Sequence, residues 1–220
     1  GGRPLSVVLA LEIESSSLEQ VIVDVLVTPF FSCDRPLRGP VARADWRLCG
    51  LLSERLQREQ LTGARGEAAL IPTAGRMKSP ILLAIGLGPR SDFGEEALRD
   101  VARDAAERLL GLRSGIVGIA LPGEAASRLA TSRAAGAVVE GVAGVLSEHP
   151  SALRLRLVVS PEEAGRTRSG LLETASRLSS SQLAIRLVRS PGAPPYRRAT
   201  PSQRAPSPAG KPAPRVDFRH

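Results

Sequence analysis

The sequence predicts an α/β fold in which helices cover both faces of a mixed, largely parallel sheet, giving a three-layer sandwich. One observation is the unbroken apolar run at 81–85, which glycines and a proline end at 86–89, as in a strand buried on both faces. Another is the segment at 95–110, whose apolar side chains repeat at the spacing of one buried helix face. The same alternation of apolar runs and amphipathic segments recurs along the 220-residue chain.

Three strands and one helix are expected before this central unit. The strands cover residues 5–13, 21–27 and 67–72, and the helix runs from about 44 to 56. Leucines at helical spacing define the buried side of that helix, and we expect Trp46 to pack in the core rather than to contact a ligand. Asp24 lies among aliphatic residues of the second strand. We expect it to face solvent or to accept a backbone hydrogen bond, with a functional role as the alternative.

Three further strands and three helices are expected from the central strand onward. Asp92 is expected to cap a helix that carries Glu95 and Glu96 in its first turn and ends near 111. The other elements are strands at 115–121, 153–157 and 183–188, and helices at 129–146 and 162–178.

Two of these later elements carry unusual residues. The strand at 153–157 alternates leucine with Arg154 and Arg156, which predicts one solvent-facing side and a place near a sheet edge. The helix at 129–146 contains Gly136, Gly141 and Gly144, which weaken it and therefore predict close packing against a neighbour.

Composition divides the chain into two parts. Hydrophobic residues make up 42% of it and aromatic residues 3%, so its core must be aliphatic. Residues 190–220 carry eight prolines, six basic residues and one acidic residue, and supply +5 of the formal net charge of +8. We therefore expect a folded domain at 1–189 and a disordered basic tail at 190–220. Weak, phosphate-mediated contact of the tail with nucleic acid is one expectation, and a plain flexible terminus is the other.

The sequence lacks the residues that several kinds of site need. Cys33 and Cys49 have no His or Cys at metal-ligand spacing, so reduced thiols are expected, with a disulfide as the open alternative. The two histidines, His149 and His220, argue against catalytic sets that require His. No apolar run approaches the ~18 residues of a membrane span. No signal-peptide cleavage site is evident, so we expect a cytoplasmic protein without membrane contact.

Two loops have features of ligand-binding loops. Residues 86–91, Gly-Leu-Gly-Pro-Arg-Ser, follow a strand as a dinucleotide-binding loop would, but a third glycine is absent and Pro89 removes a backbone donor. A tight strand-to-helix turn is the favoured interpretation. Residues 28–40 follow another strand, where α/β proteins bind ligands. Arg35, Arg38 and Arg43 form a candidate anion-binding site there, with a solvated basic loop as the favoured alternative.

Six short stretches between residues 5 and 160 follow the order of a known family. They are Val-Leu-Val at 25–27, Gly-Glu-Ala-Ala-Leu at 66–70, Ile-Leu-Leu-Ala-Ile-Gly-Leu-Gly at 81–88, Glu-Ala-Leu-Arg-Asp-Val-Ala at 96–102, Ile-Ala-Leu-Pro at 119–122 and Val-Val-Glu-Gly at 138–141. In this order they resemble the N-terminal domain of the M17 leucyl aminopeptidases. The resemblance implies a macro-domain-like fold that stands before a separate catalytic domain.

The resemblance also implies what this chain does not carry. In the family, the two metal ions and the catalytic Lys and Arg lie in the second domain, around an Asn-Thr-Asp-Ala-Glu-Gly-Arg motif that is absent here. No catalytic or metal-ligating residue can therefore be carried over, and we expect no enzyme activity and no cofactor. The expected role is that of a binding, assembly or regulatory module whose partner is another protein or further copies of the chain. Some bacterial members of the family also bind DNA.

Two alternatives stay open. The chain could be the N-terminal fragment of a longer metal-dependent leucyl aminopeptidase, or it could bind ADP-ribose or a nucleotide as macro domains do. The second alternative ranks lower because the Asn-rich and Gly-rich loops of macro domains are replaced here at 28–40. Glu124 also stands in the loop at 123–128, where it would oppose an anion.

Overall fold

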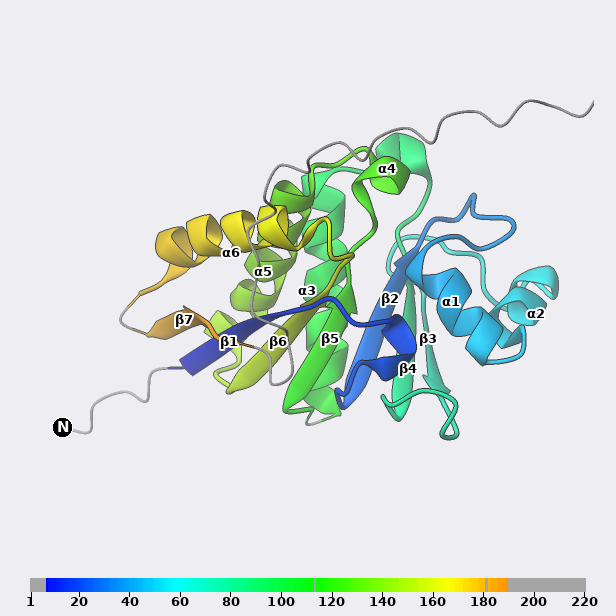
Figure 1. The fold of residues 1–220 in the computed structure, drawn as a ribbon, viewed down its shortest axis with the longest axis horizontal. Helices are drawn as coiled ribbons and strands as arrows, with labels where there is room; N and C mark the ends of the chain where they lie inside the picture. The colour runs from blue at the N-terminus through cyan, green and yellow to red at the C-terminus, as the bar shows by residue number, and fades with distance from the viewer. Residues whose placement is uncertain (1–6, 113, 181, 190–220) are drawn as a thin grey trace, which may run out of the picture.

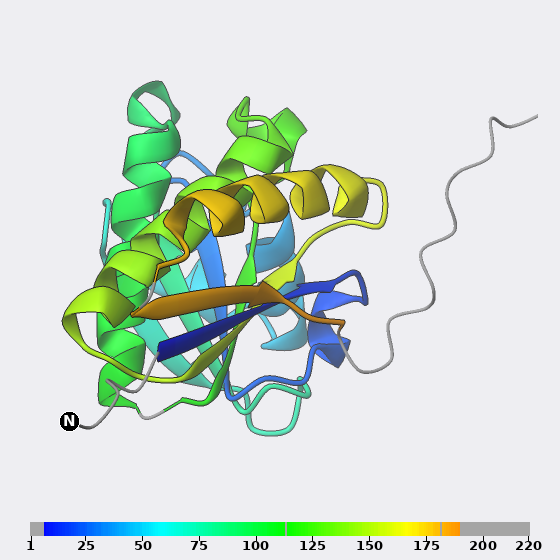
Figure 2. The same ribbon diagram turned by 90° about the vertical axis from the view of Figure 1, so that its left-hand side faces the viewer.

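A computed structural model describes residues 7–112, 114–180 and 182–189 of the chain. A seven-stranded sheet forms the middle layer, with three long helices on one face and two shorter helices on the other (Figures 1 and 2). The expected three-layer α/β sandwich with a mixed, largely parallel sheet is confirmed. The disordered tail expected at 190–220 lies outside the described residues, so the domain boundary at 189 stays a prediction.

The sheet is parallel except at one edge. Its strands are β1 (Val7–Glu14), β2 (Val25–Phe30), β3 (Ala68–Pro72), β4 (Ile81–Gly86), β5 (Ile116–Ala120), β6 (Leu153–Val158) and β7 (Leu183–Leu187), in the spatial order β3-β4-β2-β5-β6-β1-β7. Only β3 runs antiparallel to its neighbour, β4. Because the other strands are parallel, the loops that follow β2, β4, β5 and β6 gather at one end of the sheet.

The helices divide the core into two clusters. One face is covered by α3 (Glu95–Gly111), α5 (Thr131–Glu148) and α6 (Ala164–Leu178), and the other by α1 (Pro40–Arg47) and α2 (Leu51–Gln57). The shorter elements are α4 (Glu124–Ser127) and the 3-10 turns η1 (Leu18–Gln20) and η2 (Arg90–Asp92). Both clusters consist mostly of aliphatic side chains. Each fully buried Leu, Val or Ile contributes about 1.5–3 kcal/mol, so these clusters are the main source of stability.

Strand β6 is not near an edge, which makes that expectation wrong. It lies between β5 and β1, and only Arg154 of its two arginines is exposed. Arg156 is 6% exposed, because the parallel register sets it opposite Glu12 of β1, which is 1% exposed. Its Nη2 lies 2.6 Å from Glu12 Oε2, and its Nη1 donates to the Ile22 carbonyl at 2.9 Å. The alternation therefore reflects a buried ion pair rather than a solvent-facing side.

The helix expected at 44–56 is two helices. The chain turns between them at Cys49 and Gly50, whose φ angles are 58° and 81°, and this left-handed backbone cannot continue a helix. Asp45, which is buried, then holds the start of α2, because its Oδ1 accepts a hydrogen bond from the Leu52 N–H at 2.7 Å. Helix α1 also begins earlier than expected, at Pro40, a residue well suited to the first turn of a helix.

The structure shows where the side chains of Trp46 and Asp24 lie. Trp46 is 73% exposed, so the expectation of core packing is wrong. Helix α1 turns Val41 and Ala44 toward the core, and position 46 lies on its outer side. Asp24 precedes β2, and its Oδ2 accepts hydrogen bonds at 2.8 and 2.9 Å from the backbone N–H groups of Gly115 and Ile116. The expected backbone hydrogen bond of Asp24 is therefore confirmed.

Other boundaries differ only slightly from those expected. Asp92 does not cap α3, because it belongs to η2 and Gly94 is the residue that precedes the helix. Strand β2 begins at Val25 rather than at 21, and it continues through Pro29 to Phe30, past the expected end at 27. The remaining strands and helices lie within a few residues of their predicted positions.

Helix α5 packs closely against α3 and α6, as its glycines predicted. A Cβ atom on Gly141 would lie 2.4 Å from the Arg99 carbonyl oxygen of α3, and one on Gly136 would lie 2.9 Å from Thr174 Oγ1 of α6. A Cβ atom on Gly144 would have more room, with its nearest neighbour, an arginine side-chain nitrogen, at 3.4 Å. Glycine is therefore required at the first of these positions and not at the last.

Candidate functional site

A crevice lies at the carboxyl ends of β2, β4 and β5, the edge of the sheet at which α/β proteins bind ligands. In Figure 1 this edge is at the top, beside α4. The cavity has a volume of about 390 Å³, within the range of small-molecule sites. Three arginines and several small residues line it: Arg38, Arg90, Ser91, Ala125, Ala126, Ser127 and Arg128.

Arg90 ties together the loops around the crevice. It follows β4 in η2, and its Nη2 lies 2.6 Å from Oδ1 of Asp34, in the loop after β2. Its Nη1 donates to the carbonyl of Ala126 in α4, and its guanidinium lies 4.2 Å from the centroid of the Phe31 ring. Burial alone would lower the pKa of Arg90, but Asp34 and then Cys33 raise it. The charged side chain of Arg90 therefore links the loop after β2 to α4.

The three arginines expected to form one anion-binding loop are not brought together. Arg38 lines the crevice. Arg35 instead donates through Nη2 to the carbonyl of Thr62 at 3.1 Å. Arg43 lies on α1, where its Nε is 3.2 Å from Glu19 Oε2. Arg38 alone of the three remains a candidate ligand for an anion in the crevice.

Sequence reasoning missed Arg90 and Arg128, although a signal existed for both. Each follows the carboxyl end of a buried parallel strand, Arg90 after β4 and Arg128 after β5. Arg38 and Arg128 are exposed, and neither forms an ion pair with any residue that the structure describes. The unpaired charge at the mouth of the crevice is therefore positive, which suits an anionic ligand.

The acidic residues beside the crevice are engaged with neighbours. Oε2 of Glu124 lies 3.5 Å from Arg166 Nη2. Glu163, which precedes α6, accepts hydrogen bonds at 3.1 Å from the Glu124 N–H and from the Thr131 hydroxyl. Burial alone would raise the pKa of Glu163, but these bonds, together with one from Ser160, hold it below its usual value. Glu124 therefore opposes an anion less than its charge alone implies.

Residues 86–91 form the expected tight turn. The backbone N–H groups of Gly86 and Leu87 donate to the carbonyls of Glu67 and Phe30, both at 2.8 Å. The N–H of Gly88, whose φ is +74°, donates to the carbonyl of a neighbouring loop at 3.0 Å. These donors are used within the protein and cannot cradle a phosphate as a dinucleotide-binding loop does.

Both cysteines are free thiols, so the alternative disulfide between Cys33 and Cys49 is not formed. Within the described ranges, no group of three or more His, Cys, Asp or Glu side chains is placed to hold a metal ion. In that same part of the chain, no helix combines the length and the apolar character needed to cross a bilayer.

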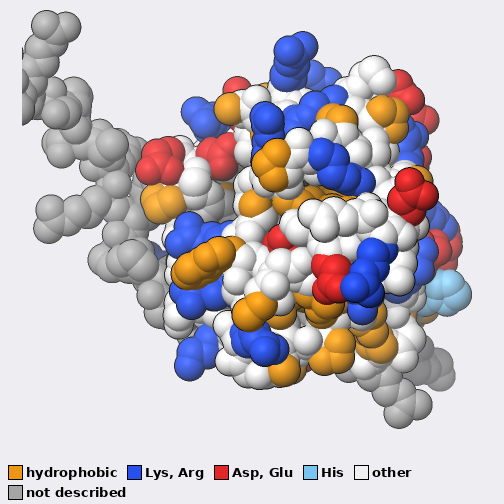
Figure 3. All heavy atoms as spheres, turned by 90° about the vertical axis from the view of Figure 1, so that its right-hand side faces the viewer, with side chains coloured by type: hydrophobic (Ala, Val, Ile, Leu, Met, Phe, Trp, Pro, Cys, Tyr) orange, Lys and Arg blue, Asp and Glu red, His pale blue; other side chains and the backbone are white. Residues whose placement is uncertain are grey.

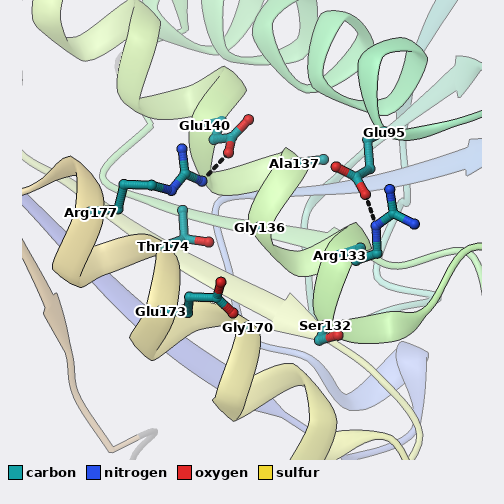
Figure 4. Close-up of a pocket in the computed structure, with 10 residues that line it drawn as sticks. All are labelled: Glu95, Ser132, Arg133, Gly136, Ala137, Glu140, Gly170, Glu173, Thr174 and Arg177. Atoms are coloured by element: carbon teal, nitrogen blue, oxygen red, sulfur yellow. Dashed lines mark hydrogen bonds and ion pairs between the residues drawn. The ribbon is translucent and has the colours of Figure 1, made fainter.

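A second, smaller hollow lies on the outside of the helical layer, where α3, α5 and α6 meet (Figure 4). Four of the five charged side chains that line it, all except Glu173, form ion pairs across the helices. Arg177 of α6 bonds Glu140 of α5, which also lies 2.6 Å from Arg99 of α3, and Arg133 bonds Glu95. Burial alone would raise the pKa of Glu140, but the two arginines lower it. These pairs join the helices and leave little charge for a ligand.

A match to a protein-family model shows which family the chain belongs to. The model of the cytosol aminopeptidase family, N-terminal domain, matches residues 30–147, more than half of the chain. The chain belongs to this family. The resemblance drawn from the six short stretches is confirmed.

The curated relatives are longer proteins. A probable cytosol aminopeptidase of Thermosynechococcus vestitus is 35% identical over 126 residues, which cover 57% of this chain and 24% of that protein. Another, from Streptomyces griseus, is 33% identical over 141 residues, which cover 60% of this chain and 25% of that protein. The chain thus matches about a quarter of the length of these relatives.

Solved structures share the fold. A macrodomain mutant of Oceanobacillus iheyensis superposes with a TM-score of 0.62 at 14% identity, covering 75% of this chain and 92% of that one. A macrodomain of Trypanosoma brucei in complex with ADP-ribose gives 0.59 at 15% identity, covering 72% and 68%. A mutant of tomato leucine aminopeptidase gives 0.54 at 17% identity, covering 77% and 36%. At these identities the likeness establishes a macro-domain-like fold and nothing further.

Proposed function

We propose that the chain acts as a non-catalytic binding, assembly or regulatory module that resembles the N-terminal domain of leucyl aminopeptidases. The observation that carries the proposal is the family match, which falls on the N-terminal domain of the family. The side chains around the crevice support it, because arginines and hydroxyls bind anions rather than the metal ions of an aminopeptidase.

We expect the purified chain not to hydrolyse leucine p-nitroanilide, with or without added zinc or manganese. A two-metal aminopeptidase needs several carboxylates that converge on two cations and activate one water. Several described carboxylates instead pair with arginines, Glu107 and Asp104 along α3 and Glu140 with Arg99 between two helices. The measurement is the rate at which p-nitroaniline is released over a range of concentrations of each metal. A metal-dependent rate that survives repurification, and that disappears when one specific carboxylate is replaced, would contradict the proposal.

ADP-ribose or nucleotide binding is the second candidate function. It is favoured by the basic crevice and by the similar fold of a macrodomain in complex with ADP-ribose. Arg90 argues against it, because its guanidinium crosses the crevice and is already bound to Asp34 and Ala126. A diphosphate that bound the Arg90 guanidinium would have to compete with these contacts.

Titration of the chain with ADP-ribose is therefore expected to give no saturable heat at micromolar protein. Isothermal titration calorimetry is the measurement. If a saturable signal does appear, replacing Arg38 or Arg128 by glutamate tests whether it arises in the crevice, and Arg35→Glu is the matched control outside it. A signal lost in the first two variants and kept in the control would establish the nucleotide-binding function in place of the proposed one.

The other alternative is that the chain is the N-terminal fragment of a longer metal-dependent leucyl aminopeptidase. It is favoured by the lengths of the relatives, of which the matched segments cover 24% and 25%. The mass of the native protein in its source cells, measured by immunoblotting, separates this alternative from a stand-alone module. The description of the relatives as cytosol enzymes supports a cytoplasmic location. Contact of residues 190–220 with nucleic acid stays a prediction.

A further inference from the structure

One surface of the protein carries side chains that neither the core nor the crevice uses. Trp46 of α1 is 73% exposed and Ile22, just after η1, is 66% exposed, the highest values among the large hydrophobic side chains that the structure describes. A tryptophan buries a large area when a partner covers it, and exposed aromatic side chains are enriched where proteins bind one another. Both lie near η1, because Ile22 follows it in the chain and α1 packs against it.

The indole of Trp46 lies beside a group of paired charges. The guanidinium of Arg47 lies 5.0 Å from the ring centroid. Arg47 Nη2 is 2.9 Å from Glu19 Oε1, and Arg43 Nε is 3.2 Å from Glu19 Oε2. A backbone hydrogen bond, and then Arg47 and Arg43, hold the pKa of Glu19 below its usual value. The arginine that contacts the indole is thus itself tied to η1 through Glu19.

The loop at 73–80 adds further positive charge beside η1. The N–H of Lys78 donates to the Glu19 carbonyl at 2.9 Å, and the hydroxyl of Ser79 donates to the Val21 carbonyl at 2.7 Å. The side chains of Arg76 and Lys78 are exposed, and they pair with no acidic group among the residues that the structure describes. Figure 3 shows basic side chains spread between hydrophobic ones on the face that carries α1 and α2. We call this surface the η1 patch, and it consists of Ile22, Arg43, Trp46, Arg47, Arg76 and Lys78.

We propose that the η1 patch docks a protein segment in which an apolar side chain stands beside acidic side chains. The apolar side chain would cover Trp46 and Ile22, and the carboxylates would meet the surrounding cations. Charge complementarity favours this partner, because the carboxylate that lies among these cations, Glu19, is 8% exposed and already bound to two of them. The proposal goes beyond the proposed function, because it concerns another surface and stands whether or not the crevice binds an anion.

A single-stranded nucleic acid fits this surface less well. Such partners need aromatic side chains on which successive bases stack. One side of the Trp46 indole faces Arg47, and Ile22 offers no aromatic surface. The patch can therefore bind phosphates through its cations but lacks the stacking surface that a chain of bases requires.

Trp46 makes the proposal directly measurable, because it is the sole tryptophan of the chain. The probe is a synthetic peptide that repeats Asp-Leu-Glu-Glu, added to the full chain at low salt. We expect a saturable change in tryptophan emission and reduced quenching by acrylamide, both weakening as salt is raised, because exposed charges are screened. Anisotropy of the fluorescein-labelled peptide gives the affinity for variants that lack the indole.

Variants at exposed positions separate the patch from other surfaces. Trp46→Ala, and the double variant Arg76→Glu with Lys78→Glu, are each expected to weaken peptide binding about tenfold or more. Both leave the bonds of Glu19 to Arg43 and Arg47 in place. The matched controls are Leu172→Ala, at a leucine on α6 that is 49% exposed, and the double variant Arg168→Glu with Arg189→Glu. These controls make the same kinds of change outside the patch and should leave the affinity unchanged.

Three outcomes would overturn the proposal. The first is the absence of a saturable signal with the peptide. The second is an equal loss of affinity in the patch variants and in their controls. The third is binding of a labelled single-stranded oligonucleotide that depends on Trp46, Arg76 and Lys78 while the peptide does not bind, which would assign the surface to nucleic acid.

Discussion

Replacing Arg156 by alanine is expected to lower the free energy of unfolding by about 3–5 kcal/mol, because it removes one partner of a buried ion pair. The carboxyl group of Glu12, which is 1% exposed, would be left inside the sheet without the guanidinium that lies 2.6 Å from it. The carbonyl of Ile22 would also lose its donor. Urea unfolding followed by circular dichroism measures the change.

Two further variants show whether burial causes the loss. Arg154→Ala removes the other arginine near Glu12, which is exposed and 3.3 Å away, and should cost no more than about 1 kcal/mol. The double variant Glu12→Leu with Arg156→Met replaces the pair by apolar side chains and should recover most of the stability that Arg156→Ala loses. If Arg156→Ala is no less stable than Arg154→Ala, the assignment of a stabilising buried pair is wrong.

Replacing Gly141 by alanine is expected to destabilise the protein by about 1–3 kcal/mol, because the added methyl group overpacks the contact between α5 and α3. Its Cβ would lie 2.4 Å from the Arg99 carbonyl oxygen and 2.9 Å from the Arg103 amide nitrogen. Both are backbone atoms of α3, so the helices must move apart before the methyl group fits. The melting temperature and the urea midpoint report the loss.

The same helix supplies the control. A methyl group on Gly144 meets only the end of the Arg103 side chain, at 3.4 Å, so Gly144→Ala should stabilise the protein by up to about 1 kcal/mol through its better helix propensity. Opposite signs for two glycine-to-alanine changes in one helix would show that packing, rather than propensity, decides the first. A stabilising Gly141→Ala would contradict the observed helix contact.

The candidate site was only partly predictable from sequence. Arg38 could be found because it follows an evident strand in a loop rich in proline and arginine. Arg90 and Arg128 lie in loops that are distant in sequence, and they meet Arg38 because β2 has β4 and β5 as its two neighbours. Strand order cannot be read from hydrophobic periodicity, which reports only the burial of each segment.

The predictions of burial for Trp46 and Arg156 were wrong for a related reason. Trp46 was expected inside because large aromatic residues usually fill cores, but the core side of α1 is already formed by smaller residues. Arg156 was expected outside because a lone charge is costly to bury. Its partner, Glu12, lies on a strand that is far away in sequence, so the pair becomes visible only once the two strands are placed side by side.

By itself, the sequence determined the α/β class, the positions of most strands and helices, the aliphatic core and the family, because each of these depends on local composition or on short ordered stretches. The tertiary structure alone decided which arginines share the crevice, which charges are buried in pairs and which side of α1 faces solvent. These features depend on contacts between segments far apart in the chain. The free energy of such contacts depends on which strands become neighbours, and no local pattern of residues specifies that order.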